Sequence, residues 1–516
     1  MDVWFIILIS LSLCFCIKFL LHLLSNSTKT NQSKTGKLPP GPSPLPFIGN
    51  LHLLPKTTVD LRSFLRSLSL KYGPVTTLHI GSEPVVFITS YSAAHEALVR
   101  NSAAFASRPS IVPLSSVLSN KRKDIGGSPY GQTWRVLRRN LNSEVLHPAR
   151  VKSYSLERKR ILGTLVNSFN QCFLHGDQPV RVLTHIHHAV FSLFIRMAFG
   201  DVNDSTIREV ERIQAELIFN YEQFTVFCSW PRLGKLLFRD RWKRYLNILK
   251  SQAEIILPLI RARKKLKQEE SKQSELVSYT DTLLDMQMND DHHQEFGKLE
   301  EADILSLCSE FMNAGADTSL TTLQWIMANI VKHPHVQAKL FAEIKAVVGE
   351  GAEEIKEEDV QKMTYLKAVI LETLRIHPPS TFLVPHAVLE DAEILGYRIP
   401  KDTTVNFAIS LIGRDPKEWD NPMEFRPERL LNRGENGELD KVSDVTAYKM
   451  MPFGSGRRIC PGMRLAILNL EYFVSNLVWN FEWKAGDGEG VDLSDKEEFL
   501  MVMKNPLRAH ISPRIK

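Results

Sequence analysis

One ten-residue loop motif restricts how this chain can fold more than any other feature. It reads Phe453-Gly454-Ser455-Gly456-Arg457-Arg458-Ile459-Cys460-Pro461-Gly462 and matches F-x-x-G-x-R-x-C-x-G at all five fixed positions. A chance match of this kind is expected in only about one in several thousand chains of this length. The glycines permit a tight loop around Cys460, and a helix that starts after Pro461 directs backbone amides toward the sulfur. The motif therefore predicts a stabilised thiolate that can serve as a metal ligand.

The other cysteines indicate no second site of this kind. The chain has six, at positions 14, 16, 172, 228, 308 and 460, which is too sparse for a disulfide-rich scaffold or a C-x-x-C metal cluster. A lone cysteine is usually a buried, inert thiol, and we keep this interpretation for Cys172, Cys228 and Cys308. Only Cys460 is expected to carry chemistry.

Composition and charge limit the class of protein. With 516 residues, 43% of them hydrophobic and 24% charged, the chain is typical of a globular protein with a sizeable core. Lysine and arginine number 64 against 58 aspartates and glutamates, a formal charge of +6. That excess is too small at this length to indicate a nucleic-acid-binding protein, so no nucleic-acid partner is expected.

Residues 1–24 are predicted to anchor the protein in a membrane. Val3–Leu24 is an almost unbroken apolar run, and a helix of that length extends about 33 Å, enough to cross a bilayer. A cleaved secretory signal is the alternative, which the length of the run and the missing small-x-small cleavage site disfavour. Lys29, Lys34 and Lys37 follow without an acidic residue, so the positive-inside rule places the rest of the chain in the cytosol.

Residues 25–50 are predicted to form a polar and proline-rich linker, and residues 51–516 one large domain. Within the linker, Leu38-Pro39-Pro40-Gly41-Pro42 is typical of a stiff, extended spacer rather than a helix or strand. No segment with the composition of a domain boundary occurs further along the chain, and no internal repeat is apparent.

The pattern of apolar residues predicts a mainly α domain with a minor β part. Two β-branched runs between Val75 and Thr89 flank a turn sequence and predict a hairpin. Short strands are expected at Ile394–Ile399 and Thr403–Ile409, and the last long helix at Pro461–Asn480. Earlier helices are predicted at Ser92–Asn101, Gln132–Val145, Asp204–Phe219, Arg241–Gln268, Glu300–Lys332, His335–Val348 and Thr364–Arg375.

With its apolar N-terminus, Pro-Pro-Gly-Pro segment and Cys460 loop, the chain resembles the cytochrome P450 superfamily of haem-thiolate monooxygenases over nearly its whole length. It is similar to the membrane-anchored plant type and, in detail, to a plant subfamily that includes an oxidase of chlorophyll breakdown products. The resemblance implies the P450 fold, a single large helical domain around haem b. It also implies that Cys460 is the axial ligand of the iron and that Phe453 contacts the cofactor.

The segment Ala314-Gly315-Ala316-Asp317-Thr318 resembles the family's oxygen-activation groove. Glycine weakens a helix, and a kink that admits O₂ and water is one reason to find it there. The resemblance implies that Asp317 and Thr318 are catalytic and relay protons to bound oxygen. In the alternative, the Thr318 hydroxyl bonds to the carbonyl four residues earlier and Asp317 faces solvent. The Cys460 loop favours the relay.

A second implied motif is structural. Glu372 and Arg375 are spaced i and i+3 on one helical face and can pair. The family locks such a pair to the arginine of a downstream P-E-R-F segment, and here Pro427-Glu428-Arg429-Leu430 stands in that place. The resemblance thus implies a triad of Glu372, Arg375 and Arg429 behind the haem, with Leu430 replacing the usual Phe.

Four residues are expected at the anionic haem propionates. Trp134 and Arg138 are spaced i and i+4, so one helical face offers a ring N–H and a guanidinium. By resemblance, Trp134, Arg138 and Arg458 hold propionates. His386 stands near the position of a further basic residue, and Ala387 follows it where relatives often carry Arg.

Electrons are expected from a separate protein, because the chain lacks a G-x-G-x-x-G dinucleotide-binding fingerprint. The resemblance implies NADPH-cytochrome P450 reductase, so NADPH acts indirectly. Arg135 and Arg139 on the outer face of their helix are a candidate contact for an acidic flavoprotein, and an ordinary solvated basic face explains them equally well.

Together these features predict a single-pass protein of the endoplasmic reticulum membrane, with a cytosolic catalytic domain that inserts one oxygen atom from O₂ into a hydrophobic small molecule of secondary metabolism. A haem-thiolate isomerase or dehydratase that acts on a hydroperoxide is disfavoured because Asp317 and Thr318 are both present. A membrane-tethered haem carrier or sensor would not need that pair. The expected substrate contacts are mostly apolar, and Asn220 and Asn313 are candidates to fix a polar group.

Overall fold

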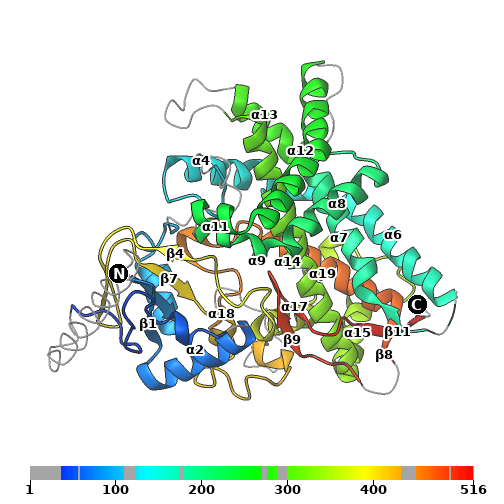
Figure 1. Ribbon diagram of the computed structural model, residues 1–516. Helices are drawn as coiled ribbons and strands as arrows, with labels where there is room; N and C mark the ends of the chain where they lie inside the picture. Colours follow the sequence, from blue (N-terminus) through cyan, green and yellow to red (C-terminus); the bar gives the residue numbers. More distant parts are fainter. Residues whose placement is uncertain are drawn as a thin grey trace, which may run out of the picture. The chain divides into compact units, whose positions relative to one another are not determined.

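The computed structural model describes most of the chain from residue 36 to residue 514 (Figure 1). The described ranges are 36–55, 58–109, 123–174, 176, 178–229, 231–269, 276–288, 299–431, 449–486 and 490–514. The predicted membrane anchor and the first part of the predicted linker lie outside these ranges.

The described residues fall into two compact units. The first unit contains the residues up to Pro109 together with Phe382–Ile412 and Ser455–Arg457. The second unit contains the described residues of Ser110–Thr381, Gly413–Gly454 and Arg458–Lys516. The assignment of 51–516 to one domain stays a prediction.

The first unit is built around a four-stranded sheet in the order β1-β2-β7-β4. Its strands are β1 (Val75–Ile80), β2 (Glu83–Ile88), β7 (Thr404–Phe407) and β4 (His386–Ala387). β1 and β2 form the predicted antiparallel hairpin, and β2 pairs with β7 in parallel. The helix α2 (Thr58–Tyr72) buries Leu65 and Leu68 against Leu78 and Phe87 of this sheet.

The strand predicted at 394–399 is instead a second hairpin of the first unit. It consists of β5 (Ala392–Ile394) and β6 (Tyr397–Ile399), because Leu395 and Gly396 between them have positive φ angles of 49° and 80° that turn the chain. The remaining elements of this unit are a 3₁₀ turn at Leu51–Leu53, α3 (Tyr91–His95), a π-helical turn at Glu96–Arg100 and α18 (Ile409–Ile412).

The proline-rich segment is fixed to the sheet of the first unit. The N–H of Thr77 in β1 donates to the carbonyl oxygen of Pro40 at 3.0 Å. A Cβ on Gly41 would lie 1.9 Å from the carbonyl oxygen of Thr77, so only glycine allows this approach. Further along, the side-chain oxygen of Asn50 accepts from the N–H of His79 at 2.8 Å. Nearer the N-terminus, the carbonyl oxygen of Lys37 accepts from the N–H of Arg398 in β6 at 3.0 Å, so the chain is held to the first unit from Lys37 onward.

The second unit is mainly helical, with small sheets at its margin. Its helices are α4 (Gln132–Asn140), followed by a π-helical turn at Leu141–Val145, α5 (Pro148–Ser153), α6 (Ser155–Leu174), α7 (Val182–Phe199), α8 (Asp204–Phe219), α9 (Tyr221–Phe224), α10 (Val226–Ser229), α11 (Pro231–Leu237), α12 (Arg239–Gln268), α13 (Tyr279–Met288), α14 (Glu301–Lys332), α15 (Pro334–Val348), α16 (Glu357–Val360), α17 (Thr364–Ile376), a 3₁₀ turn at Pro427–Leu430 and α19 (Met463–Asn480). Its strands are β3 (Val180–Arg181), β8 (Phe481–Ala485) and β11 (Arg508–Pro513) in one sheet, and β9 (Asp495–Glu497) with β10 (Met501–Met503) in another.

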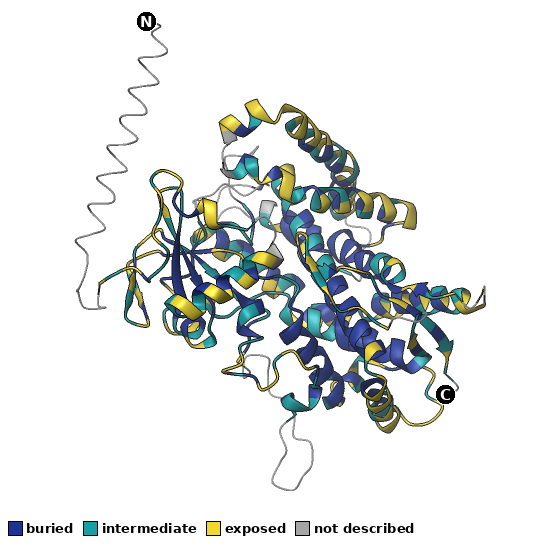
Figure 2. Ribbon diagram, turned by 60° about the horizontal axis from the view of Figure 1, so that its bottom comes forward, coloured by how far each residue is buried: buried dark blue, intermediate teal, exposed yellow. Residues whose placement is uncertain are grey.

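The core of the second unit forms around α14. This helix packs against α7, α12, α17 and α19, and almost every residue of its second half is buried. Trp325, Trp479 and Trp483 are among the largest fully buried side chains. Figure 2 shows buried residues along the inner helices and exposed residues on the outer ones. The prediction of a mainly α protein with a minor β part is confirmed.

The helices predicted from the sequence are found within two residues of their predicted ends, two of them continuing into π-helical turns. Ten helices of the described ranges were not predicted, namely α2, α5, α6, α7, α9, α10, α11, α13, α16 and α18. Of these, α7 is buried on all sides from Ala189 to Phe199, so it lacks the one-sided apolar pattern on which helix prediction depends. Within the described ranges, α7 is also the one helix long and apolar enough to cross a membrane, although most of it is buried in this unit.

Candidate active site

Cys460 lies where the motif loop meets α19. Its backbone N–H donates to the carbonyl oxygen of Phe453 at 2.9 Å and closes the loop. Burial raises the pKa of the Cys460 thiol, while hydrogen bonds from the N–H groups of Gly462 and Met463 and the charge of Arg138 act to lower it. Burial dominates, so a bound metal ion would supply the positive charge that keeps this sulfur ionised.

Two guanidinium groups flank one indole ring beside this loop. The Cζ atoms of Arg138 in α4 and of Arg458 lie 5.9 Å and 4.3 Å from the ring centroid of Trp134. Arg138 also donates to the carbonyl oxygen of Ile459 at 2.5 Å. Burial and the positive charge of Arg138 lower the pKa of Arg458 to about 10. The thiol and the two guanidiniums beside the loop fit a haem, whose iron would bind the sulfur and whose two carboxylates would pair with the arginines.

Trp134 contributes to this group in a different way from the one the spacing predicts. Its Nε1–H, which the sequence directs to a propionate, donates to the carbonyl oxygen of Ile125 at 3.1 Å. Arg458 donates to the same carbonyl oxygen at 3.3 Å and to that of Ser128 at 2.6 Å. The buried indole is thus a platform for Arg458, and the guanidiniums are the groups that suit the propionates.

His386 belongs to the first unit, where it is buried in β4. Its Nδ1 lies 2.6 Å from the carbonyl oxygen of Phe105, so this nitrogen carries the proton and donates it. The imidazole also makes an edge contact with the ring of Phe407, at 5.2 Å between centroids. These contacts fix the tautomer and orientation of His386 within its own unit, and its role at a propionate stays a prediction.

Asp317 and Thr318 lie side by side on α14, each partly exposed. The hydroxyl of Thr318 donates to the carbonyl oxygen of Ala314 at 2.7 Å, the back-bonded arrangement weighed above. Although Asp317 is partly exposed, its Oδ2 atom is buried and has no hydrogen-bond partner among the described residues. Burial raises the pKa of Asp317 to about 6, and the nearby His187 acts in the opposite direction. A carboxyl with this pKa exchanges protons readily near neutral pH.

Gly315 has a packing role in the structure. A Cβ on this residue would lie 2.1 Å from Cε1 of Phe194, so the glycine lets α14 approach α7 closely. Helix α14 runs as one α-helix through this point. Close packing against Phe194 is thus one reason for the glycine, and the kink stays a prediction.

A cluster on α7 and α8 was missed by the sequence analysis. Glu211 bonds with Nδ1 of His187 through Oε1 and with Nδ1 of His188 through Oε2, the latter at 2.9 Å. Burial works against ionisation of Glu211, but the two histidines outweigh it and lower its pKa to about 2. The adjacent histidines in an otherwise apolar helix are the sequence signal that could have shown this site, which brings charge near Asp317.

The two asparagines considered for substrate contacts both have protein partners. Nδ2 of Asn313 donates to Oε1 of Gln214 at 3.0 Å, and Nδ2 of Asn220 donates to the carbonyl oxygen of Glu216 at 2.8 Å. The Oδ1 atoms of both asparagines and Nε2 of Gln214 are buried without a hydrogen-bond partner among the described residues. These atoms keep the capacity to accept and donate hydrogen bonds.

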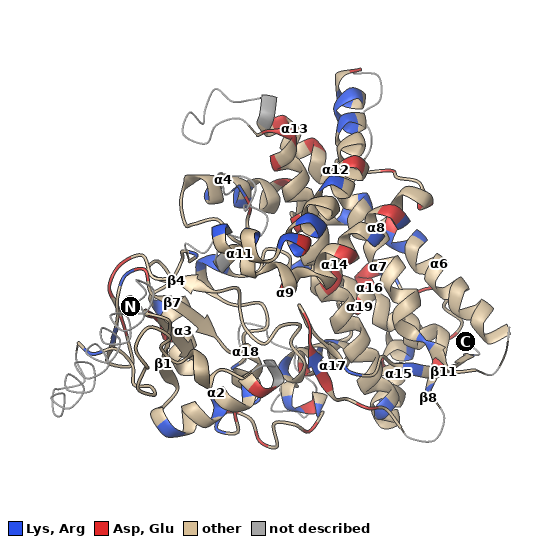
Figure 3. Cartoon of the chain, viewed as in Figure 1, with Lys and Arg blue, Asp and Glu red and all other residues tan. Residues whose placement is uncertain are grey.

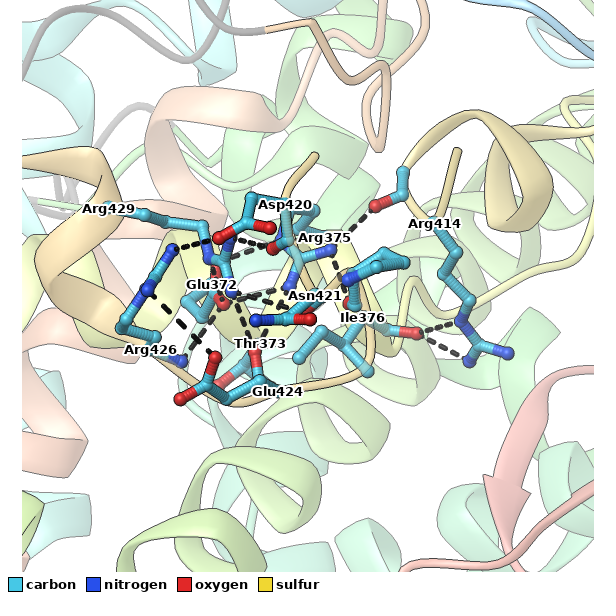
Figure 4. A network of polar contacts seen from close by, with 12 residues as sticks. Glu372, Thr373, Arg375, Ile376, Arg414, Asp420, Asn421, Glu424, Arg426 and Arg429 are labelled. Atoms are coloured by element: carbon cyan, nitrogen blue, oxygen red, sulfur yellow. Dashed lines mark hydrogen bonds and ion pairs between the residues drawn. The ribbon is translucent and has the colours of Figure 1, made fainter. Parts of the chain in front are cut away.

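The implied triad is present in the second unit (Figure 4). Glu372 and Arg375 are completely buried, and two nitrogens of Arg375 donate to the carboxylate at 2.8 Å. Nε of Arg429 donates to Oε1 of Glu372 at 2.9 Å. Arg375 also donates to the carbonyl oxygens of Gly413 and Pro422. The triad thus ties α17 to the segment that leads to the Cys460 loop, as a structural element.

Comparison with known proteins agrees with this site. Residues 39–512 match the family model described as cytochrome P450. Cytochrome P450 89A9 of Arabidopsis thaliana is 44% identical over 490 residues, covering 93% of this chain and 95% of that protein. Cytochrome P450 71B8 of the same plant is 33% identical over 510 residues (96% and 97% covered), and cytochrome P450 71D7 of Solanum chacoense 33% over 506 residues (96% and 98%). The chain has a cysteine loop suited to a haem-thiolate cofactor and relatives of this kind along almost its full length. It belongs to the cytochrome P450 family of monooxygenases.

Proposed function

We propose that the protein is a membrane-anchored monooxygenase that oxidises a hydrophobic plant metabolite with O₂ and with electrons from NADPH-cytochrome P450 reductase. The observation that carries this proposal is the thiol of Cys460, which accepts hydrogen bonds from the amides at the start of α19 and lies near Arg138, while Arg138 and Arg458 share the ring of Trp134. Bound haem supplies the redox centre at which O₂ is reduced and one oxygen atom enters the substrate.

Five residues of the site have distinct tasks in this proposal. Cys460 binds the iron, and Arg138 and Arg458 hold the propionates by charge-assisted hydrogen bonds. Asp317 holds and releases a proton at its buried Oδ2 atom, since its pKa of about 6 suits transfer near neutral pH. Thr318 donates to Ala314 and keeps its lone pairs free to accept a hydrogen bond from the oxygen site.

Membrane attachment is supported by the sequence and by one feature of the first unit. The apolar run Val3–Leu24 is long enough to span a bilayer. Shortly after it, the side chains of Leu45, Phe47, Ile48 and Leu51 are 39%, 54%, 44% and 41% exposed. A group of exposed apolar residues next to an anchor favours contact with lipid. The plant relatives and the lysines after the run support an endoplasmic reticulum location with the catalytic part in the cytosol.

The reductase is proposed to dock near α4. Arg135 and Arg139 are exposed on this helix, whereas Trp134 is buried and Arg138 is half-buried. Figure 3 shows the Lys and Arg positions of α4 in blue. The helix thus presents positive charge to solvent on one side and binds the cofactor with the other. Such a face suits a transient encounter with an acidic flavoprotein.

The substrate is proposed to be mainly apolar with at least one polar group. The unpartnered amide atoms of Asn220, Asn313 and Gln214 support the polar contact. The sequence resemblance to a plant subfamily that includes an oxidase of chlorophyll breakdown products makes such products the first compounds to test.

The test is spectroscopic and metabolic. The reduced protein with carbon monoxide is expected to show the red-shifted Soret band of thiolate ligation, and Cys460→Ser to lose it while Cys308→Ser keeps it. An unshifted band in the wild type would contradict thiolate ligation. NADPH-dependent uptake of O₂ with reductase present separates a monooxygenase from an isomerase or a haem carrier, neither of which consumes both.

A further inference from the structure

A short turn before α4 connects α14 with the cofactor-binding arginine. The turn, residues 124–128, is closed by Asp124, whose Oδ1 accepts from the N–H groups of Gly127 at 2.5 Å and Ser128 at 2.8 Å. It presents two carbonyl oxygens to Arg458, those of Ile125 and Ser128, at 3.3 Å and 2.6 Å. The position of Arg458 therefore depends on where this turn lies.

Glu310 of α14 holds the turn from its other side. Oε2 of Glu310 accepts from the N–H of Ile125 at 2.9 Å, and Oε1 accepts from the N–H of Gly126 at 2.5 Å. A Cβ on Gly126 would lie 2.8 Å from Oε1, so glycine permits the contact. Both hydrogen bonds involve an ionised acceptor, which makes them stronger than neutral ones.

The contacts form a continuous chain from α14 to the cofactor-binding group. Ile125 gives its N–H to Glu310 and its carbonyl oxygen to both Trp134 and Arg458. A shift of this one peptide segment therefore moves the indole and the guanidinium together. An ion pair of Lys123 with Asp303, at 3.1 Å, adds a second link between the start of the turn and α14.

We propose that Glu310 is a positioning residue of the cofactor site, which through the backbone of Ile125 and Gly126 fixes Arg458, and the indole of Trp134 against which it packs, where Arg458 holds a haem propionate. The proposal rests on the proposed function, because it takes Arg458 as a propionate ligand. The inference goes beyond that function by assigning a role to Glu310, which no sequence motif marks. Glu310 precedes Asp317 by two helical turns, so α14 serves the cofactor's carboxylates as well as the proton site.

The charges near Arg458 agree with this role. The negative charges of Asp124 and Glu310 favour the ionised guanidinium of Arg458, against the effects of burial and of Arg138.

Haem release measures this effect without relying on activity. Full-length wild type, Glu310→Gln and Glu310→Ala, each loaded with haem, are mixed with excess apomyoglobin as the haem acceptor. Loss of a hydrogen-bonded charge typically costs enough free energy to change a dissociation rate about tenfold, so Glu310→Ala is expected to release haem about tenfold faster than the wild type. The release rate of Glu310→Gln is expected to lie between those two rates. The matched control is Glu301→Gln, an exposed carboxylate of the same helix that pairs with Arg261, expected to stay within about twofold of the wild type.

A double-mutant cycle separates positioning from a general structural effect. If Glu310 acts through Arg458, the logarithm of the rate increase caused by Glu310→Gln falls to less than half in an Arg458→Ala background. Equal increases in both backgrounds, or wild-type release from Glu310→Ala, would overturn the inference. If the wild type itself shows no thiolate-ligated haem, the proposed function fails instead, and the two failures are distinguishable.

Discussion

Replacing Asp317 by asparagine tests how burial controls the proposed proton site. The folded protein raises the pKa of this carboxyl from 3.8 to about 6, chiefly because the carboxylate is desolvated. At about 1.4 kcal/mol for each tenfold change in proton affinity, the ionised form costs the fold about 3 kcal/mol. Asparagine carries no charge at any pH, so Asp317→Asn is expected to be the more stable protein at neutral pH.

The sign of the pH dependence follows from the direction of the pKa change. A carboxyl whose pKa is raised on folding binds its proton more tightly in the folded state, so the stability it contributes is full below about pH 4 and is lost as the pH rises through about 6. The stability advantage of Asp317→Asn should therefore reach about 3 kcal/mol at pH 8 and about half of that at pH 5.

Urea unfolding of the haem-loaded proteins between pH 5 and pH 8 measures this difference. Asp285→Asn is a matched control, because Asp285 is an exposed carboxylate on α13, paired with Lys267, and should change the free energy of unfolding by less than about 1 kcal/mol. In parallel, Asp317→Asn should convert less of the consumed NADPH into product, since it cannot release a proton. A stability difference that does not vary with pH, or a wild type that is the more stable protein at pH 8, would refute the reasoning.

Two further predictions concern packing and charge in the second unit. Glu372→Gln leaves the buried guanidiniums of Arg375 and Arg429 without their counter-charge and should lower the free energy of unfolding by about 3–5 kcal/mol; stability and haem content near those of the wild type would contradict a structural triad. Gly315→Ala should cost about 1–3 kcal/mol because its Cβ meets the ring of Phe194, and Phe194→Leu in the same chain should restore part of the loss; an Ala variant as stable as the wild type would show that the two helices do not need the glycine.

Much of the fold was predictable because the signal is local. The helices from α8 to α19 that carry a one-sided apolar stripe were found from the spacing of apolar residues, and the hairpin of β1 and β2 from two β-branched runs around a turn. The sequence signal for α7 was not local in this sense. Every residue from Ala189 to Phe199 is buried, Ser192 and Arg196 included, and only the surrounding helices show why.

The candidate site was predictable in its residues and less so in their contacts. The spacing of Trp134 and Arg138 places both on one face, as found, but it does not reveal that the indole N–H is used by Ile125. The contact of Glu310 with Gly126 joins residues 184 positions apart, and no motif records it. Gly315 shows the same limit, because Phe194, the residue whose ring requires a glycine there, lies on another helix. Contacts between distant segments decide these roles, and a single sequence does not display them.

The contacts of Lys37 and Pro40 with the first unit set the length of the proposed tether. The carbonyl oxygen of Lys37 accepts from the N–H of Arg398 in β6 at 3.0 Å, so in the proposed membrane-anchored protein only the residues between the anchor and Lys37 separate the first unit from the bilayer. From Ser25 to Gly36, at no more than about 3.5 Å per residue, this segment spans roughly 40 Å when fully extended. Loss of the Lys37 and Pro40 contacts would lengthen it without adding a residue, so the close approach that Gly41 allows helps to limit how far the first unit can lie from the bilayer.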